Sequence, residues 1–181
     1  LQEFIDSYIA RHQSVLAQLA SCASDIETMA HTCITALESG HKLLICGNGG
    51  SAADAQHMAA ELVGRFIADR PALAAIALTT DTSALTAIAN DYGYGDVFSR
   101  QVAGLARADD VLLAISTSGQ SASVLAACET ARARGCRVLG LSGRDGGALK
   151  EACDAIVVAP ATETAHIQEC HIVVIHLVCA L

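Results

Sequence analysis

Five short runs of continuous apolar sequence recur along the chain, separated by longer segments with helical spacing. Strands that are apolar throughout are buried on both faces, which is typical of parallel strands in a sheet covered by helices on both sides. We therefore predict an α/β fold, a three-layer αβα sandwich with a five-stranded parallel sheet plus an N-terminal helix. The expected strands are KLLICG (42–47), LAAIALTT (73–80), DVLLAI (110–115), RVLGLS (137–142) and AIVVAP (155–160).

The segments between the strands have apolar residues at helical spacing. No linker, low-complexity segment or fixed-period repeat interrupts them, so residues 1–181 are expected to form a single domain. The first 40 residues predict one helix, 2–39, with Gly40 as its stop. The other expected helices are 52–66, one or two across 82–106, 123–134, 148–152 and 163–181.

The chain is unusually apolar. Hydrophobic residues make up 52% and charged residues only 17%, which is more apolar surface than a monomer of 181 residues easily buries. No apolar run reaches the roughly 18 residues that a membrane span needs. We therefore expect a soluble protein with no membrane contact that buries surface against copies of itself, with the helix 2–39 packing in that oligomer.

Charge and cysteine usage argue against a nucleic-acid-binding protein and against a fold held by disulfides or zinc–thiolate sites. The net charge is −8 with no lysine or arginine cluster, so nucleic-acid binding is not expected. The eight cysteines are scattered, with no C-x-x-C pair, and the sequence shows no signal-peptide pattern. Small buried thiols in a reducing cytoplasm are favoured over disulfides or zinc–thiolate sites.

Polar clusters follow four of the expected strands, at the sheet edge where ligands bind in such folds. Turns between strands and helices favour glycine, serine and aspartate in any case, but residues 116–121 (STSGQS) place four hydroxyls and a glycine in six residues. Helix capping accounts for one such hydroxyl, whereas hydroxyls and free N–H groups at a helix start form an uncharged anion cradle. We predict a phosphate site formed by Ser116, Thr117, Ser118 and Ser121.

The turn 47–52 (GNGGSA) fits the G-x-G-x-x-A pattern of dinucleotide-binding folds, which is weak evidence alone. That pattern also needs an acidic residue about 20 positions later, whereas the acid ending the second strand here is Asp81. The glycines are better interpreted as letting substrate hydroxyls approach the backbone.

His57 and Glu61 lie four residues apart on the helix after this turn, so their side chains share one face. Such a pair can hold a metal, act in proton transfer, or make an ordinary surface contact. In the last helix Gln168 and His176 are polar residues in an apolar segment, about 12 Å apart along the axis. They can share one ion only from opposite sides, or contribute to sites in different subunits.

Several longer motifs stand in order along the chain: CGNGGSAADAQHMAAELVGRF (46–66), TAIANDYGYGDVF (86–98), LLAISTSGQS (112–121), GLSGRDGG (140–147) and HIQECHIVVIHLVCAL (166–181). They resemble, in the same order, segments of the phosphoheptose isomerases, which are sedoheptulose 7-phosphate isomerases with the sugar isomerase (SIS) fold. The resemblance runs from about residue 5 to the end of the chain.

The resemblance implies an aldose–ketose isomerase that forms D-glycero-D-manno-heptose 7-phosphate through an enediol(ate), the first step of heptose biosynthesis for lipopolysaccharide or related glycans. It implies a homotetramer with active sites at subunit interfaces, and one Zn²⁺ per subunit held by His57, Glu61, Gln168 and His176. Glu61 and His176 would be the acid–base pair, although Glu61 cannot easily be both a tight metal ligand and a free base. Substrate contacts would come from Asn48, Gly49, Gly50, Ser51, Glu61, Asn90, Asp91, Gln168 and the phosphate cradle, Ser116, Thr117, Ser118 and Ser121.

One position departs from the family pattern: His166 stands where an arginine is common. Two other functions remain open for this fold. One is a non-catalytic tetramer that binds the replication initiator protein, which would be expected to lack the Glu61 and His176 pair. The other is a sugar-phosphate sensor, which needs the phosphate cradle alone.

Overall fold

The computed structural model describes all 181 residues and contains one five-stranded sheet. The strand order is β2-β1-β3-β4-β5, and every neighbouring pair is parallel, as predicted. Gly47 pairs with Ile115, so β1 and β3 end side by side and the loops that follow them meet at one edge. The strands are β1 (Leu43–Gly47), β2 (Ala75–Ala77), β3 (Val111–Ile115), β4 (Arg137–Gly143) and β5 (Ala155–Ala159).

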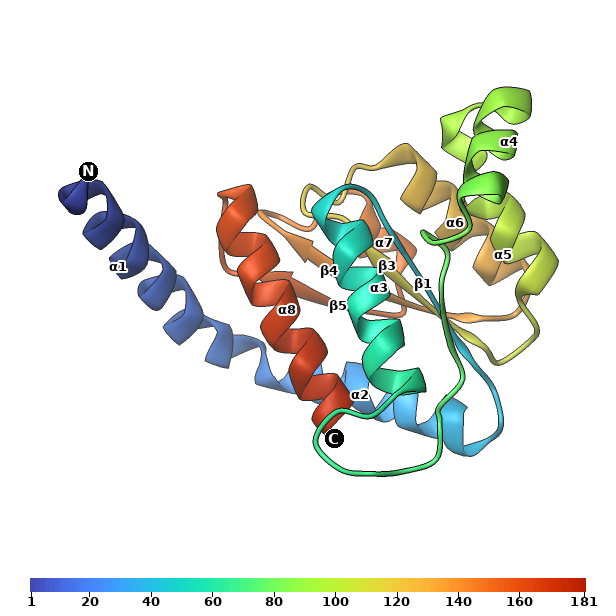
Figure 1. Cartoon of the computed structure of the whole chain (residues 1–181), viewed down its shortest axis with the longest axis horizontal. Helices are drawn as coiled ribbons and strands as arrows, with labels where there is room; N and C mark the ends of the chain where they lie inside the picture. The colour runs from blue at the N-terminus through green and yellow to red at the C-terminus, as the bar shows by residue number, and fades with distance from the viewer.

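Helices cover both faces of the sheet, which confirms the three-layer arrangement (Figure 1). Alternate residues of β1 point to opposite faces: Leu43 and Ile45 join one hydrophobic core, and Leu44 and Cys46 join the other. The first core includes side chains from α2 (Ala23–Glu38), α3 (Gly50–Val63) and α8 (Thr164–Ala180). The second includes side chains from α5 (Ser99–Leu105), α6 (Ala122–Ala133) and α7 (Leu149–Ala152).

The N-terminal segment is not one helix over 2–39. It divides into α1 (Gln2–Gln18), a 3₁₀ turn η1 (Leu19–Cys22) and α2. Leu19 and Cys22 are buried in the first core, so the turn bends the chain to let α2 follow the sheet. LASC contains neither Gly nor Pro, so no local signal marks the break.

α1 contains no buried residue and extends away from the body of the protein (Figure 1). Several of its apolar side chains are solvent-exposed within the single chain: Phe4 is 66% exposed, Ile9 48% and Ile5 41%. Exposed apolar residues on a projecting helix are typical of a surface that a second chain covers.

The second strand is shorter than predicted, Ala75–Ala77 instead of 73–80. It lies at the sheet edge and pairs only with β1, and the hydroxyls of the following Thr79 and Thr80 donate to the carbonyls of Ala52 and Ala77. α3 ends at Val63, three residues before the predicted end, since Gly64 follows it. The segment 82–106 contains two α-helices, α4 (Thr82–Tyr92) and α5, separated by the 3₁₀ turn η2 (Tyr94–Asp96).

All eight cysteines are free thiols. Six are buried, and burial raises the pKa of the Cys33 thiol to about 12. They therefore behave as small apolar side chains, as the sequence predicted. No helix has both the length and the hydropathy required to cross a membrane.

Candidate active site

A polar pocket of about 340 Å³ lies at the carboxyl ends of β1 and β3. Three segments far apart in the sequence form it: the glycine-rich turn into α3, the loop between β3 and α6, and the start of α8. The parallel register brings the first two together, and the packing of α8 on α3 adds the third. Its lining residues are Asn48, Gly49, Gly50, Ser51, Ile115, Ser116, Thr117, Ser118, Ser121, Thr164 and Gln168.

The loop 116–121 presents hydroxyls and unpaired backbone donors to this pocket. Gly119 adopts a φ of 64°, a left-handed conformation that folds the loop back on itself. The N–H groups of Thr117, Ser118 and Ser121 donate to no protein atom, whereas that of Gln120 is bonded to the Ser118 hydroxyl at 3.2 Å. Free N–H groups and hydroxyls beside a helix N-terminus suit an anion such as a phosphate.

The Asn48 carboxamide is fixed by three hydrogen bonds that link separate loops. Its Nδ2 donates to the hydroxyls of Ser121 at 2.8 Å and Ser123 at 3.0 Å. Its Oδ1 accepts from the Tyr94 hydroxyl at 2.7 Å. Ser121 therefore does not cap α6, because its hydroxyl faces Asn48. This network connects the glycine-rich turn to both the loop 116–121 and η2.

Gln168 lies against Gly50. A Cβ atom at Gly50 would collide with the carboxamide of Gln168, so the glycine lets this side chain lie where it does. Gln168 consequently belongs to the pocket at the strand ends.

Three other predicted site residues, His57, Glu61 and His176, form a cluster farther along α3 and α8, where these two helices pack together. Nε2 of His57 is 3.2 Å from Oε1 of Glu61 and 3.2 Å from Nε2 of His176. The Phe66 ring stacks on His176, with ring centroids 5.3 Å apart and planes inclined by 16°. The structure thus brings together His57, Glu61 and His176.

Gln168 is separated from this cluster within one chain. Gly50 and Gln168 lie near the N-terminal ends of α3 and α8, which run side by side. His57 follows Gly50 by seven residues on α3, and His176 follows Gln168 by eight residues on α8. This places the cluster about 10 to 12 Å from Gln168 along the helix axes. Of the four residues expected to hold one metal ion, three meet in a single chain.

Asn90 and Asp91 do not line the pocket. Both are exposed at the end of α4, a helix without buried residues, and Asn90 donates to the Asp91 carboxylate at 2.8 Å. Within one chain neither residue contacts the other predicted site residues.

Three polar residues in or beside the pocket were not predicted from the sequence: Tyr94, Ser123 and Thr164. Tyr94 belongs to the motif TAIANDYGYGDVF, which was recognised, but only Asn90 and Asp91 were selected from it. Ser123 continues the hydroxyl-rich run STSGQSAS, so its position was a usable signal. Nothing in the local pattern marked Thr164, which reaches the pocket because α8 begins there.

Known proteins match this chain over its full length. The SIS domain model matches residues 7–143. A phosphoheptose isomerase from Nitratiruptor sp. is 53% identical over 99% of this chain and 96% of its own. The solved phosphoheptose isomerase from Neisseria gonorrhoeae has a TM-score of 0.95 and 46% identity, covering 99% of this chain and 97% of its own. The solved phosphoheptose isomerase from Francisella tularensis has a TM-score of 0.96 and 38% identity, covering 99% of this chain and 96% of its own.

The chain therefore belongs to the SIS domain family, and within it to the phosphoheptose isomerases.

Proposed function

We propose that this chain is an aldose–ketose isomerase that converts sedoheptulose 7-phosphate into D-glycero-D-manno-heptose 7-phosphate. The observation that carries the proposal is a hydroxyl-lined pocket at the start of α3 and α8, together with a carboxylate–imidazole cluster farther along these two helices. The 53% identity to a phosphoheptose isomerase over nearly the whole chain supports the same substrate. This reaction would be the first step of heptose biosynthesis.

The substrate phosphate would bind the loop 116–121. Its free N–H groups and the hydroxyls of Ser116, Thr117, Ser118 and Ser121 supply hydrogen-bond donors without a positive side chain. Such a site suits a phosphate monoester in a protein of net charge −8, because attraction is local. The sugar hydroxyls would meet Asn48, Gly49, Gly50, Ser51 and Gln168, with Asn90 and Asp91 contributing from α4.

The reaction moves a proton between C1 and C2 through an enediol(ate). A carboxylate must remove a carbon-bound proton, and a second group must handle the proton on oxygen. We propose Glu61 as the base and His176 as the acid; tight binding of zinc by the same side chains would compete with these roles. The stacked Phe66 ring orients the His176 imidazole, and the i,i+4 spacing aims His57 at the Glu61 carboxylate.

His57, Glu61 and His176 would supply a nitrogen and oxygen ligand set of the kind that zinc binds. Ligand atoms around a tetrahedral zinc ion with bonds of about 2.0–2.1 Å lie about 3.3 Å apart. His57 lies 3.2 Å from both Glu61 and His176, in agreement with that value, whereas Glu61 and His176 would have to approach each other to bind the same ion. Zinc bound there would polarise the substrate carbonyl and favour negative charge on its oxygen. Gln168 would complete the ligand set from another subunit.

We propose a homotetramer in which subunits complete one another's sites. Three features support shared sites: Gln168 is remote from the cluster, Asn90 and Asp91 are remote from the pocket, and His57 is exposed. The apolar side chains of α1 supply an interface. We place the protein in the cytoplasm, consistent with eight free thiols.

The direct test is an NMR time course with sedoheptulose 7-phosphate, using chelator-treated protein with and without added zinc. Appearance of the aldoheptose 7-phosphate is the expected result, and comparison of the two samples shows the metal requirement. Phosphosugar binding without turnover would favour the sensor. Neither turnover nor binding would favour the scaffold for the replication initiator, and both of these outcomes contradict the proposal.

A further inference from the structure

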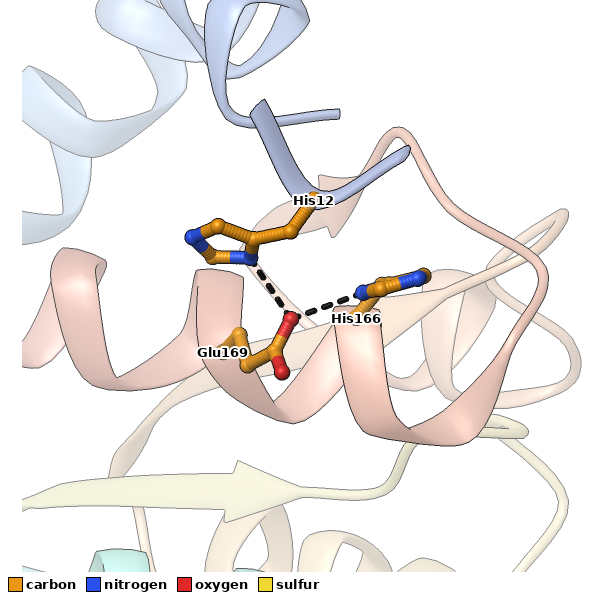
Figure 2. Close-up of side chains that lie close together, drawn as sticks. All are labelled: His12, His166 and Glu169. Atoms are coloured by element: carbon orange, nitrogen blue, oxygen red, sulfur yellow. Dashed lines mark hydrogen bonds and ion pairs between the residues drawn. The ribbon is translucent and has the colours of Figure 1, made fainter. Parts of the chain in front are cut away.

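A second cluster of metal-ligating side chains lies on the opposite side of α8 from Gly50, where α1 meets α8. Figure 2 shows His12 of α1 and His166 of α8 pointing toward Glu169. Nδ1 of His12 is 2.6 Å and Nδ1 of His166 is 2.7 Å from the same oxygen, Oε2 of Glu169. The three potential ligand atoms all lie within 4.8 Å of one another.

This cluster is separate from the candidate active site. Successive residues of an α-helix are rotated by about 100°, so Glu169 faces away from its neighbour Gln168. Gln168 lies against Gly50 of α3, whereas Glu169 contacts His12 of α1. His166 and Glu169 are three residues apart and share the face that α1 covers.

Further polar groups surround these side chains. The Tyr8 hydroxyl donates to Oε1 of Glu169 at 2.8 Å, which orients the carboxylate. Nε2 of His166 lies 3.6 Å from Oε2 of Glu163. Metal-binding histidines usually direct their second ring nitrogen at a carboxylate or carbonyl in this way.

The buried Nε2 of His166 has no hydrogen-bond partner, so this ring is the unsatisfied member of the cluster. A neutral His166 that donates from Nδ1 to Glu169 carries a lone pair on Nε2, opposite another acceptor, the Glu163 carboxylate. A metal ion on Nδ1 displaces the proton to Nε2, which then points at Glu163. Metal binding to a neutral His166 therefore places an N–H donor opposite the Glu163 carboxylate, where the metal-free neutral ring would place the Nε2 lone pair opposite another acceptor.

We propose that His12, His166 and Glu169 bind one divalent transition-metal ion of the zinc class, leaving a fourth position for water. Two imidazoles and one carboxylate favour zinc, cobalt or nickel over magnesium or calcium. The ligand atoms need to separate by roughly 0.6 Å to seat an ion with bonds of about 2.0–2.1 Å. His12 and Glu169, each with one third of its side chain exposed, have room for that movement.

The consequence of this site is attachment of α1. α1 has no fully buried residue, and its contacts with α8 and the segment before it include the ion pair of Arg11 with Glu163 at 3.5 Å and the hydrogen bond of Tyr8 to Glu169. One ion with a ligand on α1 and two on α8 fixes the direction in which α1 projects. The bound ion thereby orders the exposed apolar face of that helix.

The test is zinc titration by calorimetry of untagged, chelator-treated protein. Every titration uses protein that already carries the double variant His57→Ala/His176→Ala, called the background protein. This variant removes two of the three side chains of the His57, Glu61 and His176 cluster, so that zinc binding there does not contribute. One zinc ion per chain is the expected result, together with a tetrahedral Co²⁺ spectrum. In this background His12→Gln should weaken zinc binding at least tenfold, whereas His31→Gln, at an exposed histidine of α2, should not change it.

Hydrogen exchange supplies the second measurement. Zinc should slow amide exchange in α1 of the background protein and leave it unchanged when His12→Gln is added. Since His12 is only partly buried, this variant preserves the core even if changes at buried His166 do not. Absence of zinc binding in the background, or equal binding by His12→Gln, would overturn the proposal.

Discussion

The Tyr94 hydroxyl donates a hydrogen bond to the Asn48 carboxamide across 46 residues of sequence. This bond selects the orientation of Asn48 in which Nδ2 faces Ser121 and Ser123. Tyr94 thus acts as a positioning residue for the pocket, although its ring is 59% exposed. It ties the short turn after α4 to the glycine-rich turn after β1.

Replacing Tyr94 with Phe should raise KM for the phosphosugar about fivefold and change kcat less. The reason is that an ordinary hydrogen bond contributes about 1 kcal/mol, and this one fixes a ground-state contact. Steady-state kinetics measure the effect. Tyr92→Phe is the matched control, since Tyr92 is similarly exposed and packs against Arg100. Equal effects of both variants would contradict a specific role for Tyr94.

Gly50→Ala should reduce kcat/KM by more than tenfold, because the added methyl group displaces Gln168 from the pocket. Thermal stability should change little, because the displaced atoms are the end of a flexible side chain. Turnover assays and thermal unfolding measure the two effects. Gly95→Ala has open space around its Cβ and serves as the control. Full activity of Gly50→Ala would refute the requirement for Gln168.

Glu61→Gln should abolish turnover while leaving phosphosugar affinity within a few-fold, measured by NMR and calorimetry. The amide cannot accept the carbon-bound proton. If Glu61 acts mainly as a metal ligand, excess zinc should restore part of the activity. The control is Glu27→Gln, because Glu27 and His31 form an exposed i,i+4 pair on α2 like that of Glu61 and His57. Undiminished turnover by Glu61→Gln would rule out the assignment of the base.

His171 should make the protein sensitive to acid. Burial lowers the pKa of this histidine to about 4, partly opposed by its hydrogen bond to the Ser142 carbonyl at 2.9 Å. The folded pKa lies below the unfolded value of 6.5, so stability is fully present above pH 6.5 and falls as the pH drops toward 4. The expected loss is about 3 kcal/mol.

Urea unfolding from pH 7 to pH 4 measures this loss, with His171→Gln as the reference because its amide can donate to Ser142 without titrating. Asp54 contributes in the opposite direction, since burial raises its pKa to about 6. That contribution is common to both proteins and cancels in the comparison. A constant difference in the free energy of unfolding between them across this range would disprove the assignment to His171.

The arrangement of layers was determined by the sequence alone. Runs such as LLICG and VLLAI are apolar at every position, and in alternation with helices such runs indicate strands with both faces covered. The hydroxyl-rich loop 116–121 and the turn 47–52 follow two of those strands, so both were expected at the same edge of a parallel sheet. That β1 and β3 are direct neighbours there was seen only in the structure.

Tertiary structure decided what depends on contacts between distant residues. The bend at Leu19–Cys22 exists because α2 must follow the sheet, and the sequence LASC carries no local signal for it. The Tyr94–Asn48 bond, the placement of Gln168 against Gly50 and the convergence of His12, His166 and Glu169 join segments 46 to 157 residues apart. Periodicity reports which face of a helix is apolar. Periodicity does not report which side chains of another element will lie beside that helix, because the packing of the elements sets the distances between their side chains.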